Sequence, residues 1–187
     1  MPADRAQTLS VLTDAFAGDP VVRWIFPDDA TYPARAETFF GFLFDVRVAA
    51  RGAWITAGGE SVALWSPPGD AAGEWEERAW ANVADTFTAS ELERCGAWDA
   101  AVAPHHPDAQ HWYLGVLGTA SRSQGRGLGP AVAGPGLAAA RDEALPAFLE
   151  TAIEGNVRLY ERLGFAVTAT IDDPDLPYGW CMSREPA

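Results

Sequence analysis

An apolar segment at residues 111–118 runs almost directly into a glycine-rich loop, and no other part of the sequence restricts the fold as strongly. Turn-forming residues bound the segment, which is typical of a central strand covered on both faces. Helical periodicity follows at residues 127–144, and a second apolar strand is expected at residues 146–151. This order of strand, loop, helix and strand predicts an α/β unit whose parallel strands are joined by a right-handed crossover.

Other expected elements surround this unit. Before it, helices are predicted at residues 5–17, from Asp19-Pro20 onwards, at 33–50 and over 74–95, and hairpin strands at 53–56 and 60–66 around Gly58-Gly59. Residues 103–107 are expected to be an irregular loop, and the chain is expected to close with a helix at 156–163 and strands at 166–171 and 180–183. No internal repeat or linker is evident. We therefore expect one α/β domain over residues 1–187, with a mixed central sheet flanked by helices.

Composition excludes several classes of protein. The 48% hydrophobic content supplies a buried core, and a net charge of −13 disfavours binding to nucleic acid. All 13 cations are arginines, so the lysine of a Schiff-base enzyme or of a phosphate-binding P-loop is absent. Two cysteines are too few for a clustered metal site, and the apolar runs are too short to span a bilayer. A cytoplasmic protein without membrane or nucleic-acid partners is expected.

The glycine-rich loop is the strongest candidate for chemistry. Glycines between a strand and a helix let successive backbone amides face an anion, and the helix dipole adds partial positive charge. The spacing does not match the dinucleotide fingerprint G-x-G-x-x-G, because Pro130 or Val132 stands where its last glycine should be. A tight turn with no ligand, or a nucleotide-binding α/β domain, remains the alternative. The helix after the loop is expected to kink or loosen at Gly134-Pro135-Gly136.

A wider pattern gives this loop a family. The order Gln124-x-x-Gly127-x-Gly129 after an apolar strand resembles the acyl-CoA pyrophosphate motif of the GNAT N-acetyltransferase superfamily. The downstream segments are similar in order and spacing to the puromycin N-acetyltransferase branch: Leu149-Glu150-Thr151, Asn156-x-x-x-Tyr160-Glu161-Arg162-x-Gly164-Phe165 and Trp180-Cys181-Met182. The similarity is dense from about residue 111 onwards and thin before it.

The resemblance implies the GNAT acyl-CoA N-acyltransferase fold, with acetyl-CoA as co-substrate and no metal. It implies that the backbone of Leu117, Gly118 and Thr119 pairs with pantetheine and offers an amide to the thioester oxygen. Asn156 is implied to contact the coenzyme. The pyrophosphate is implied to bind Gln124, Gly125, Arg126, Gly127, Leu128 and Gly129. Because pantetheine lies where two strands would otherwise pair, a bulge or splay is expected between residues 115–118 and 147–151.

One departure from the family concerns its first strand. The family opens with a strand before its first helix, whereas this chain begins at about the position of that helix. The sheet is therefore expected to lack this strand or to replace it. An uncovered edge would leave backbone groups unpaired unless another segment, or a second copy in a homodimer, covers it.

Two side chains are candidates for catalysis. By the resemblance, Tyr160 matches the tyrosine that protonates the departing thiolate, and a phenol with a pKa of ~10 carries that proton at pH 7. Glu150 lies near the end of an apolar strand, where it can accept the proton of an amine directly or through water. The alternatives are a tyrosine that only packs against the sheet and a glutamate at the surface or in an ion pair.

Other candidates are weaker. His105, His106 and His111 surround the start of the central strand, where they would relay protons or simply lie in a surface loop. Arg122 and Arg126 are candidates to meet phosphates. The acceptor site is expected in the helical first half, with walls from Asp19, Arg23, Trp24, Phe44 and Trp65.

These observations predict transfer of acetyl from acetyl-CoA to a primary amine of a small molecule, by direct attack in a ternary complex. No G-x-S-x-G elbow or paired cysteine offers an acyl-enzyme nucleophile. The resemblance implies an antibiotic-like acceptor such as puromycin, or an aminoacyl amine. The alternatives are a non-catalytic acyl-CoA sensing module and, less favoured, a protein N-terminal or lysine acetyltransferase.

Overall fold

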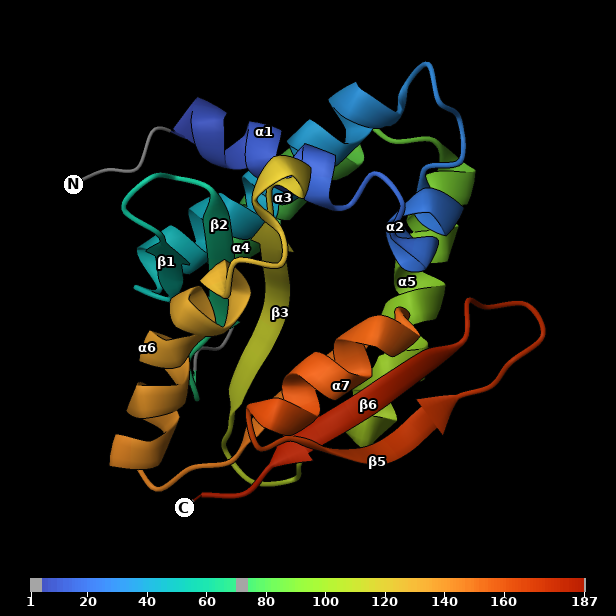
Figure 1. The fold of residues 1–187 in the computed structure, drawn as a ribbon. Helices are drawn as coiled ribbons and strands as arrows, with labels where there is room; N and C mark the ends of the chain where they lie inside the picture. Colours follow the sequence, from blue (N-terminus) through green and yellow to red (C-terminus); the bar gives the residue numbers. More distant parts are fainter. Residues whose placement is uncertain (1–4, 70–73, 187) are drawn as a thin grey trace.

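The computed structural model describes residues 5–69 and 74–186 (Figure 1). In chain order the helices and strands are α1 (Arg5–Ala15), α2 (Pro20–Ile25), α3 (Tyr32–Ala49), β1 (Ala53–Ile55), β2 (Ser61–Ser66), α4 (Glu74–Ala84), α5 (Ala89–Val102), η1 (Ala103–His105), β3 (Trp112–Thr119), η2 (Ser121–Ser123), α6 (Leu128–Asp142), β4 (Ala147–Thr151), α7 (Glu154–Arg162), β5 (Ala166–Ile171) and β6 (Gly179–Arg184). The predicted mixed α/β architecture is confirmed.

Six strands of the described residues form one mixed sheet in the order β1-β2-β3-β4-β6-β5. Its neighbours are antiparallel except β3 and β4, which are parallel and connected through α6. The predicted parallel pair is thus present. Among the described residues no strand precedes α1, and the short β1, which follows α3, forms the edge of the sheet on that side.

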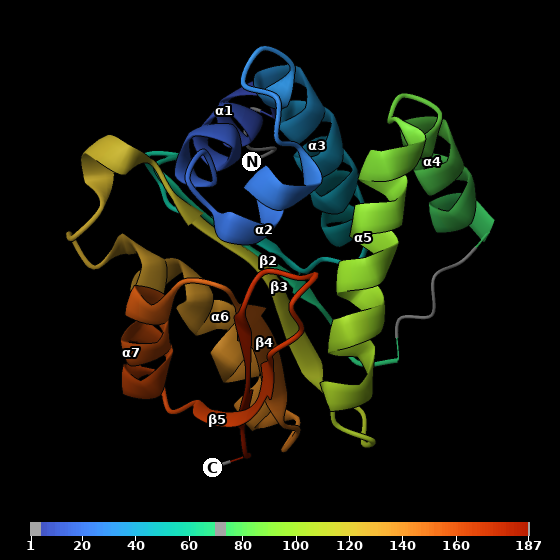
Figure 2. The ribbon, with the colours of Figure 1, turned by 90° about the vertical axis from the view of Figure 1, so that its right-hand side faces the viewer.

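Helices cover both faces of the sheet (Figure 2). On one face α1, α2 and α3 bury apolar side chains against Val62, Leu64 and Val116, and α5 packs against the same face nearer β4 and β6. On the other face α6 and α7 pack against Ala63 and Leu149, among other residues. We call the first face the α1–α5 face and the second the α6–α7 face. Burial of both faces gives the sheet a core on each side.

Capping residues explain where the first-half helices begin. The Asp19 side chain accepts hydrogen bonds from the amides of Val21 and Val22, so α2 begins at Pro20 as expected. Thr88 and Glu91 form a reciprocal capping box. This box corrects the prediction of one helix over residues 74–95, because it starts a separate helix, α5, after α4 has ended. The expected irregular loop at residues 103–107 also begins with a short 3₁₀ helix, η1.

The central strand β3 contains a bulge at Gly115. Leu64 of β2 pairs with Val116 and Trp65 pairs with Leu114, so that Gly115 is left without a direct partner on β2. Leu114 packs on the α6–α7 face, but Val116 packs on the α1–α5 face. The bulge therefore reverses the side-chain alternation halfway along β3.

Beyond this point β3 and β4 separate. Their parallel pairing covers only Trp112 with Ala147 and Tyr113 with Phe148. The rest of β3 remains paired with β2, and the rest of β4 remains paired with β6. The splay expected between residues 115–118 and 147–151 is confirmed, and it opens a gap in the middle of an otherwise continuous sheet.

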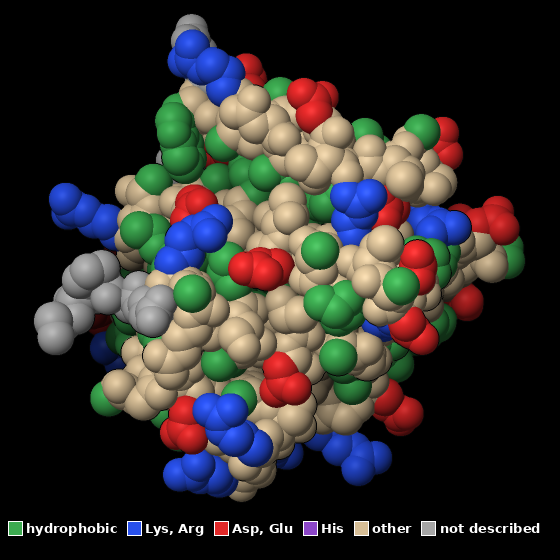
Figure 3. All heavy atoms as spheres, turned by 90° about the horizontal axis from the view of Figure 1, so that it is seen from above, with side chains coloured by type: hydrophobic (Ala, Val, Ile, Leu, Met, Phe, Trp, Pro, Cys, Tyr) green, Lys and Arg blue, Asp and Glu red, His purple; other side chains and the backbone are tan. Residues whose placement is uncertain are grey.

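Helix α6 continues as a helix through Pro135, where we expected it to kink or loosen. The helix packs closely on the sheet at this point, because a side-chain carbon at Gly136 would overlap the ring of Trp65. Both cysteines, Cys95 and Cys181, are buried and free. No helix of the described residues is long and apolar enough to cross a membrane. Figure 3 shows acidic and basic side chains interspersed over the face seen from above.

We predict that Gly136→Ala destabilises the protein by about 1–3 kcal/mol, since the fully buried Trp65 cannot move away without disturbing the core. Gly134→Ala is the matched control on the same helix: nothing lies within 4 Å of the added carbon, and alanine is the better helix former by about 0.5–1 kcal/mol. Urea unfolding measures both changes. Equal stability of the two variants would contradict this packing.

Candidate functional site

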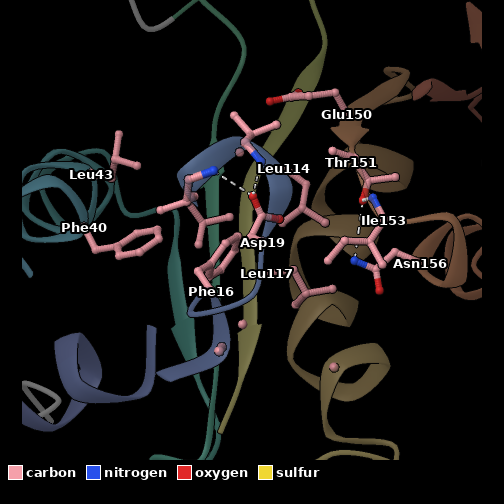
Figure 4. A pocket seen from close by; sticks show the side chains of 18 of the residues that line it. Phe16, Asp19, Phe40, Leu43, Leu114, Leu117, Glu150, Thr151, Ile153 and Asn156 are labelled. Carbon is pink, nitrogen blue, oxygen red and sulfur yellow. Dashed lines mark hydrogen bonds between the residues drawn. The ribbon is translucent and has the colours of Figure 1, made fainter. Parts of the chain in front are cut away.

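A large cavity, about 1110 Å³ in volume, passes through the gap between β3 and β4. Its walls come from both faces of the sheet, from α1, α2, α3, α4 and α5 on one side and from α6 and α7 on the other. Figure 4 shows Phe40 and Leu43 on one side of this space, Ile153 and Asn156 on the other, and Asp19 between them. One continuous space thus connects the glycine-rich loop with the helical first half.

The glycine-rich loop adopts a conformation that glycine favours. Gly125 and Gly127 have φ values of +74° and +76°, in the left-handed region, and Gly127 caps the N-terminus of α6. Within the part of the chain that the structure describes, the amides of residues 125–129 donate no hydrogen bond to a protein acceptor. These amides and the N-terminal end of the helix dipole can therefore bind an anion at the mouth of the cavity.

The structure brings almost all predicted coenzyme-binding residues to this cavity. Those that line it are Leu117, Gly118, Thr119, Gln124, Gly125, Gly127, Leu128, Gly129 and Asn156. Arg126 does not line it, because its guanidinium donates to Glu60 Oε1 at 3.3 Å and to Ser123. A coenzyme contact from this side chain stays a prediction that requires it to leave Glu60.

The α6–α7 side of the gap is polar near the end of β4. Asn156 Nδ2 donates to the hydroxyl of Thr151 at 3.4 Å, and both residues line the cavity (Figure 4). Tyr160 follows one helical turn later, is buried in the α6–α7 core with its ring against Phe165, and also lines the cavity. The Asn156 and Tyr160 of the sequence motif therefore face the same space.

Glu150 is on the opposite side of the gap. It follows Phe148, which packs on the α1–α5 face, by two residues on β4, so its side chain projects to that face. Tyr113 donates its phenolic hydrogen to Glu150 Oε1 at 2.8 Å, whereas the buried Oε2 makes no well-formed hydrogen bond. Glu150 lines the cavity, and within the described residues Oε2 is the carboxylate oxygen that lacks a well-formed hydrogen bond.

The pKa of Glu150 is raised to about 7, mainly by burial, and the carboxylate of Asp99 contributes in the same direction. The hydrogen bonds from Tyr113 and, more weakly, the nearby indole of Trp98 oppose this shift. A carboxyl group with a pKa near neutrality is suited to take up a proton and release it again. Glu150 therefore has the properties of a general base.

Burial also raises the pKa of Tyr160, and the negative charges of Glu150 and Asp19 act in the same direction. The phenol consequently stays protonated at neutral pH and serves only as a donor. Glu150 and Tyr160 come from opposite sides of the sheet, and both line the cavity.

The histidines lie outside the cavity walls. His106 Nδ1 and His111 Nε2 are 3.0 Å apart, and the His106 ring packs on Phe148 and Tyr113. Burial and the neighbouring His111 lower the pKa of His106. Among the described residues no hydrogen bond joins this pair to Glu150, so a proton relay through it stays a prediction. In the described residues no cluster of three or more His, Cys, Asp or Glu side chains has a metal-binding arrangement.

Only one of the five expected wall residues lines the cavity. Asp19 does so, and burial raises the pKa of its carboxyl group. The other four do not. Trp65 and Phe44 are core residues, Arg23 pairs with Asp29, and Trp24 packs at the edge of the core. At Trp24 and Phe44 the apolar residues at helical spacing pack in or against the core.

Sequence reasoning missed three important residues on the α1–α5 side: Tyr113, Trp98 and Asp99. Tyr113 lies in the predicted central strand, but only the pairing of β3 with β4 brings it beside Glu150. Trp98 and Asp99 follow the region predicted as a helix, and no motif marks them. The sequence signal that could have identified Trp98 and Asp99 as site residues is an acidic residue next to a tryptophan on an amphipathic helix.

Comparisons with known proteins agree with this geometry. The model of the Acetyltransferase (GNAT) family matches residues 62–165. A structure described as histone acetyltransferase HPA2 and related acetyltransferase from Corynebacterium glutamicum ATCC 13032 is 27% identical, covers 100% of this chain and 93% of its own, and has a TM-score of 0.70. Arylalkylamine N-acetyltransferase 2 from Aedes aegypti shares 13% identity over 98% of this chain and 94% of its own, with a TM-score of 0.63.

The raised pKa of Glu150 predicts a specific dependence of stability on pH. From an ordinary value near 4.5 the pKa rises to about 7 in the folded protein, so between these values the folded state binds more protons than the unfolded chain. Protonated Glu150 makes its full contribution to the free energy of unfolding below about pH 4.5, and this contribution is lost as the pH rises through 7. Relative to Glu150→Gln, the wild-type protein should therefore lose free energy of unfolding from pH 5 to 7.5.

Urea unfolding over that pH range measures the difference between the two proteins. Tyr113→Phe is the companion variant, because loss of its hydrogen bond should raise the pKa of Glu150 further and extend the decline to higher pH. A difference between wild type and Glu150→Gln that stays constant with pH would show that Glu150 is not perturbed.

Proposed function

Because this chain belongs to the GNAT family of acetyltransferases and is an acetyl-CoA-dependent N-acetyltransferase, we propose that its acceptor is the primary amine of a small molecule and that both substrates bind before transfer. The observation that carries the proposal is the gap between β3 and β4. It joins an anion-binding loop on one side to an enclosed, helix-lined chamber with a carboxyl group on the other.

In this proposal acetyl-CoA enters along the α6–α7 side. The amides of residues 125–129 bind its diphosphate, and pantetheine occupies the gap, where it hydrogen-bonds to β3 at Leu117, Gly118 and Thr119 in place of a neighbouring strand. Asn156 at the start of α7 contacts the coenzyme. The closed hydrogen bond between Asn156 and Thr151 supports this role, because it fixes the direction of the amide group.

The chamber on the other side of the gap binds the amine. The amine nitrogen attacks the thioester carbonyl carbon, and an amide on the free edge of β3 stabilises the negative charge that develops on the carbonyl oxygen. Glu150 accepts the proton that the amine loses as the C–N bond forms. Its raised pKa supports this role, because a carboxyl group that titrates near neutrality can take up a proton and release it again.

The carbon–sulfur bond then breaks and the thiolate of CoA leaves. Tyr160 donates a proton, or first a hydrogen bond, to that sulfur from the α6–α7 side. Its burial and its place in the cavity wall support this role, because the O–H group stays protonated and is shielded from water. The proton donor Tyr160 and the proton acceptor Glu150 thus act on the reacting atoms from opposite sides of the sheet.

The sequence similarity to the puromycin N-acetyltransferase branch favours an antibiotic-like or aminoacyl acceptor. The test is a panel of amines supplied with acetyl-CoA, in which release of free thiol is followed. Puromycin, aminoglycosides and simple aryl and alkyl amines form the panel. We expect acetyl transfer to at least one of these amines. Double-reciprocal plots of initial rate against one substrate, at several concentrations of the other, should intersect, as transfer through a ternary complex requires. If CoA binds and no amine is acetylated, the chain is instead a sensing module.

We predict that Tyr160→Phe lowers kcat at least ~100-fold, since proton donation by a positioned side chain contributes about this much to a rate. Binding of CoA, measured by calorimetry, should stay unchanged, because only one oxygen atom is removed. Tyr178→Phe is the matched control, for Tyr178 is exposed and outside the cavity wall. Undiminished turnover in Tyr160→Phe with every acceptor would reject the assigned role.

A further inference from the structure

The half of the cavity on the α1–α5 face has walls of an unusual kind. Six aromatic side chains line it, one from just after α1 and the others from α3, α4 and α5: Phe16, Phe39, Phe40, Phe42, Trp80 and Trp98. Aliphatic side chains of α2 add to this surface, and the charged residues Arg47, Glu76, Glu77 and Asp99 of α3, α4 and α5 also line the cavity. The rings present faces and edges as the apolar part of the walls. They favour a flat, apolar body over a hydroxyl-rich one such as a sugar.

Two carboxylates border this half of the cavity, those of Asp99 and Glu150. Asp99 follows Trp98 on α5; the residue is exposed, and partial desolvation of its carboxyl group raises its pKa. The negative charge of Asp99 in turn raises the pKa of both Glu150 and Tyr113. Among the described residues no hydrogen bond or salt bridge is formed by the Asp99 side chain.

Glu150 supplies a second and independent sign of a ligand. Its Oε2 atom is buried without a well-formed hydrogen bond, and the residue lines the cavity. A buried carboxylate oxygen is costly to leave without a partner. Asp99 and Glu150 line one cavity together with the aromatic side chains, where a ligand cation would be bound by the carboxylates and attracted by the surrounding rings.

We propose that the acceptor is a primary amine attached to an aromatic body by a short alkyl chain, and that Asp99 is the specificity residue that binds its ammonium group beside Glu150. The proposal rests on the acetyl transfer inferred above and adds the class of acceptor. The aromatic body packs among the rings of α3, α4 and α5. The ammonium lies at the gap, where Glu150 takes the proton and the neutral amine then meets the thioester.

Equilibrium binding tests this inference separately from turnover. CoA without an acetyl group is first bound to the protein, so that no reaction occurs, and three probes are then titrated by calorimetry. They are 2-phenylethylamine, its neutral counterpart 2-phenylethanol, and ethanolamine, which has the amine without the ring. We expect 2-phenylethylamine to bind at least ~10-fold more tightly than either of the other two.

Asp99→Asn should abolish the preference for 2-phenylethylamine over 2-phenylethanol while leaving CoA affinity unchanged. Asp85→Asn is the matched control, since it removes the same charge from an exposed position outside the cavity wall and should retain the preference. Equal binding of ethanolamine and 2-phenylethylamine, or an unchanged preference in Asp99→Asn, would overturn the proposal.

The outcomes also separate this inference from the proposed function. If other amines are acetylated but 2-phenylethylamine does not bind, the proposed function stands and the acceptor class is wrong. If 2-phenylethylamine binds with the expected dependence on Asp99 but no amine is acetylated, the acceptor site is supported and the proposed transfer to a small-molecule amine is wrong.

Discussion

The separation of β3 from β4 after Tyr113 is the constraint on which the site depends. A sheet that opens in its middle leaves amide and carbonyl groups without ladder partners, and such groups are expensive to bury unless something else satisfies them. The structure limits this cost by keeping β3 paired with β2 and β4 paired with β6 along their outer sides. The free inner edges then become binding groups for an extended ligand.

Two local features maintain this opening. The bulge at Gly115 turns β3 so that Leu114 and Val116 pack on opposite faces, and each anchors its half of the strand in a different core. The parallel pair at Trp112 and Tyr113 closes the sheet below the gap. Tyr113 then binds Glu150, which ties the two separated strands together at the point where they part.

On the α6–α7 side the glycine-rich loop could be predicted from the sequence, because Gln124 and Gly127 lie in one continuous strand–loop–helix unit. Asn156 follows on the next helix, where the family resemblance rather than local geometry pointed to it, and the structure brings all three residues to one cavity. Local signals also predicted the start of α2, for Asp19 caps its own helix. Such features depend on residues close together in the chain.

The α1–α5 side could not be predicted in the same way. Asp99 reaches the site through the packing of α5 against β4 and β6, and the capping box at Thr88 that sets the start of α5 was not recognised. Regular alternation from Trp112 would put Leu114 and Val116 on one face, and only the bulge shows otherwise. Trp65 and Phe44, which were expected to line the acceptor site, are instead buried in the two hydrophobic cores.

A structure of the protein in complex with CoA tests the central claim most directly. The account predicts that the diphosphate lies within hydrogen-bonding distance of the amides of residues 125–129, with pantetheine extended along the inner edge of β3 between the two separated strands. The account would be contradicted if those amides were bonded to protein acceptors, β3 and β4 were paired along their whole length, and CoA were bound elsewhere.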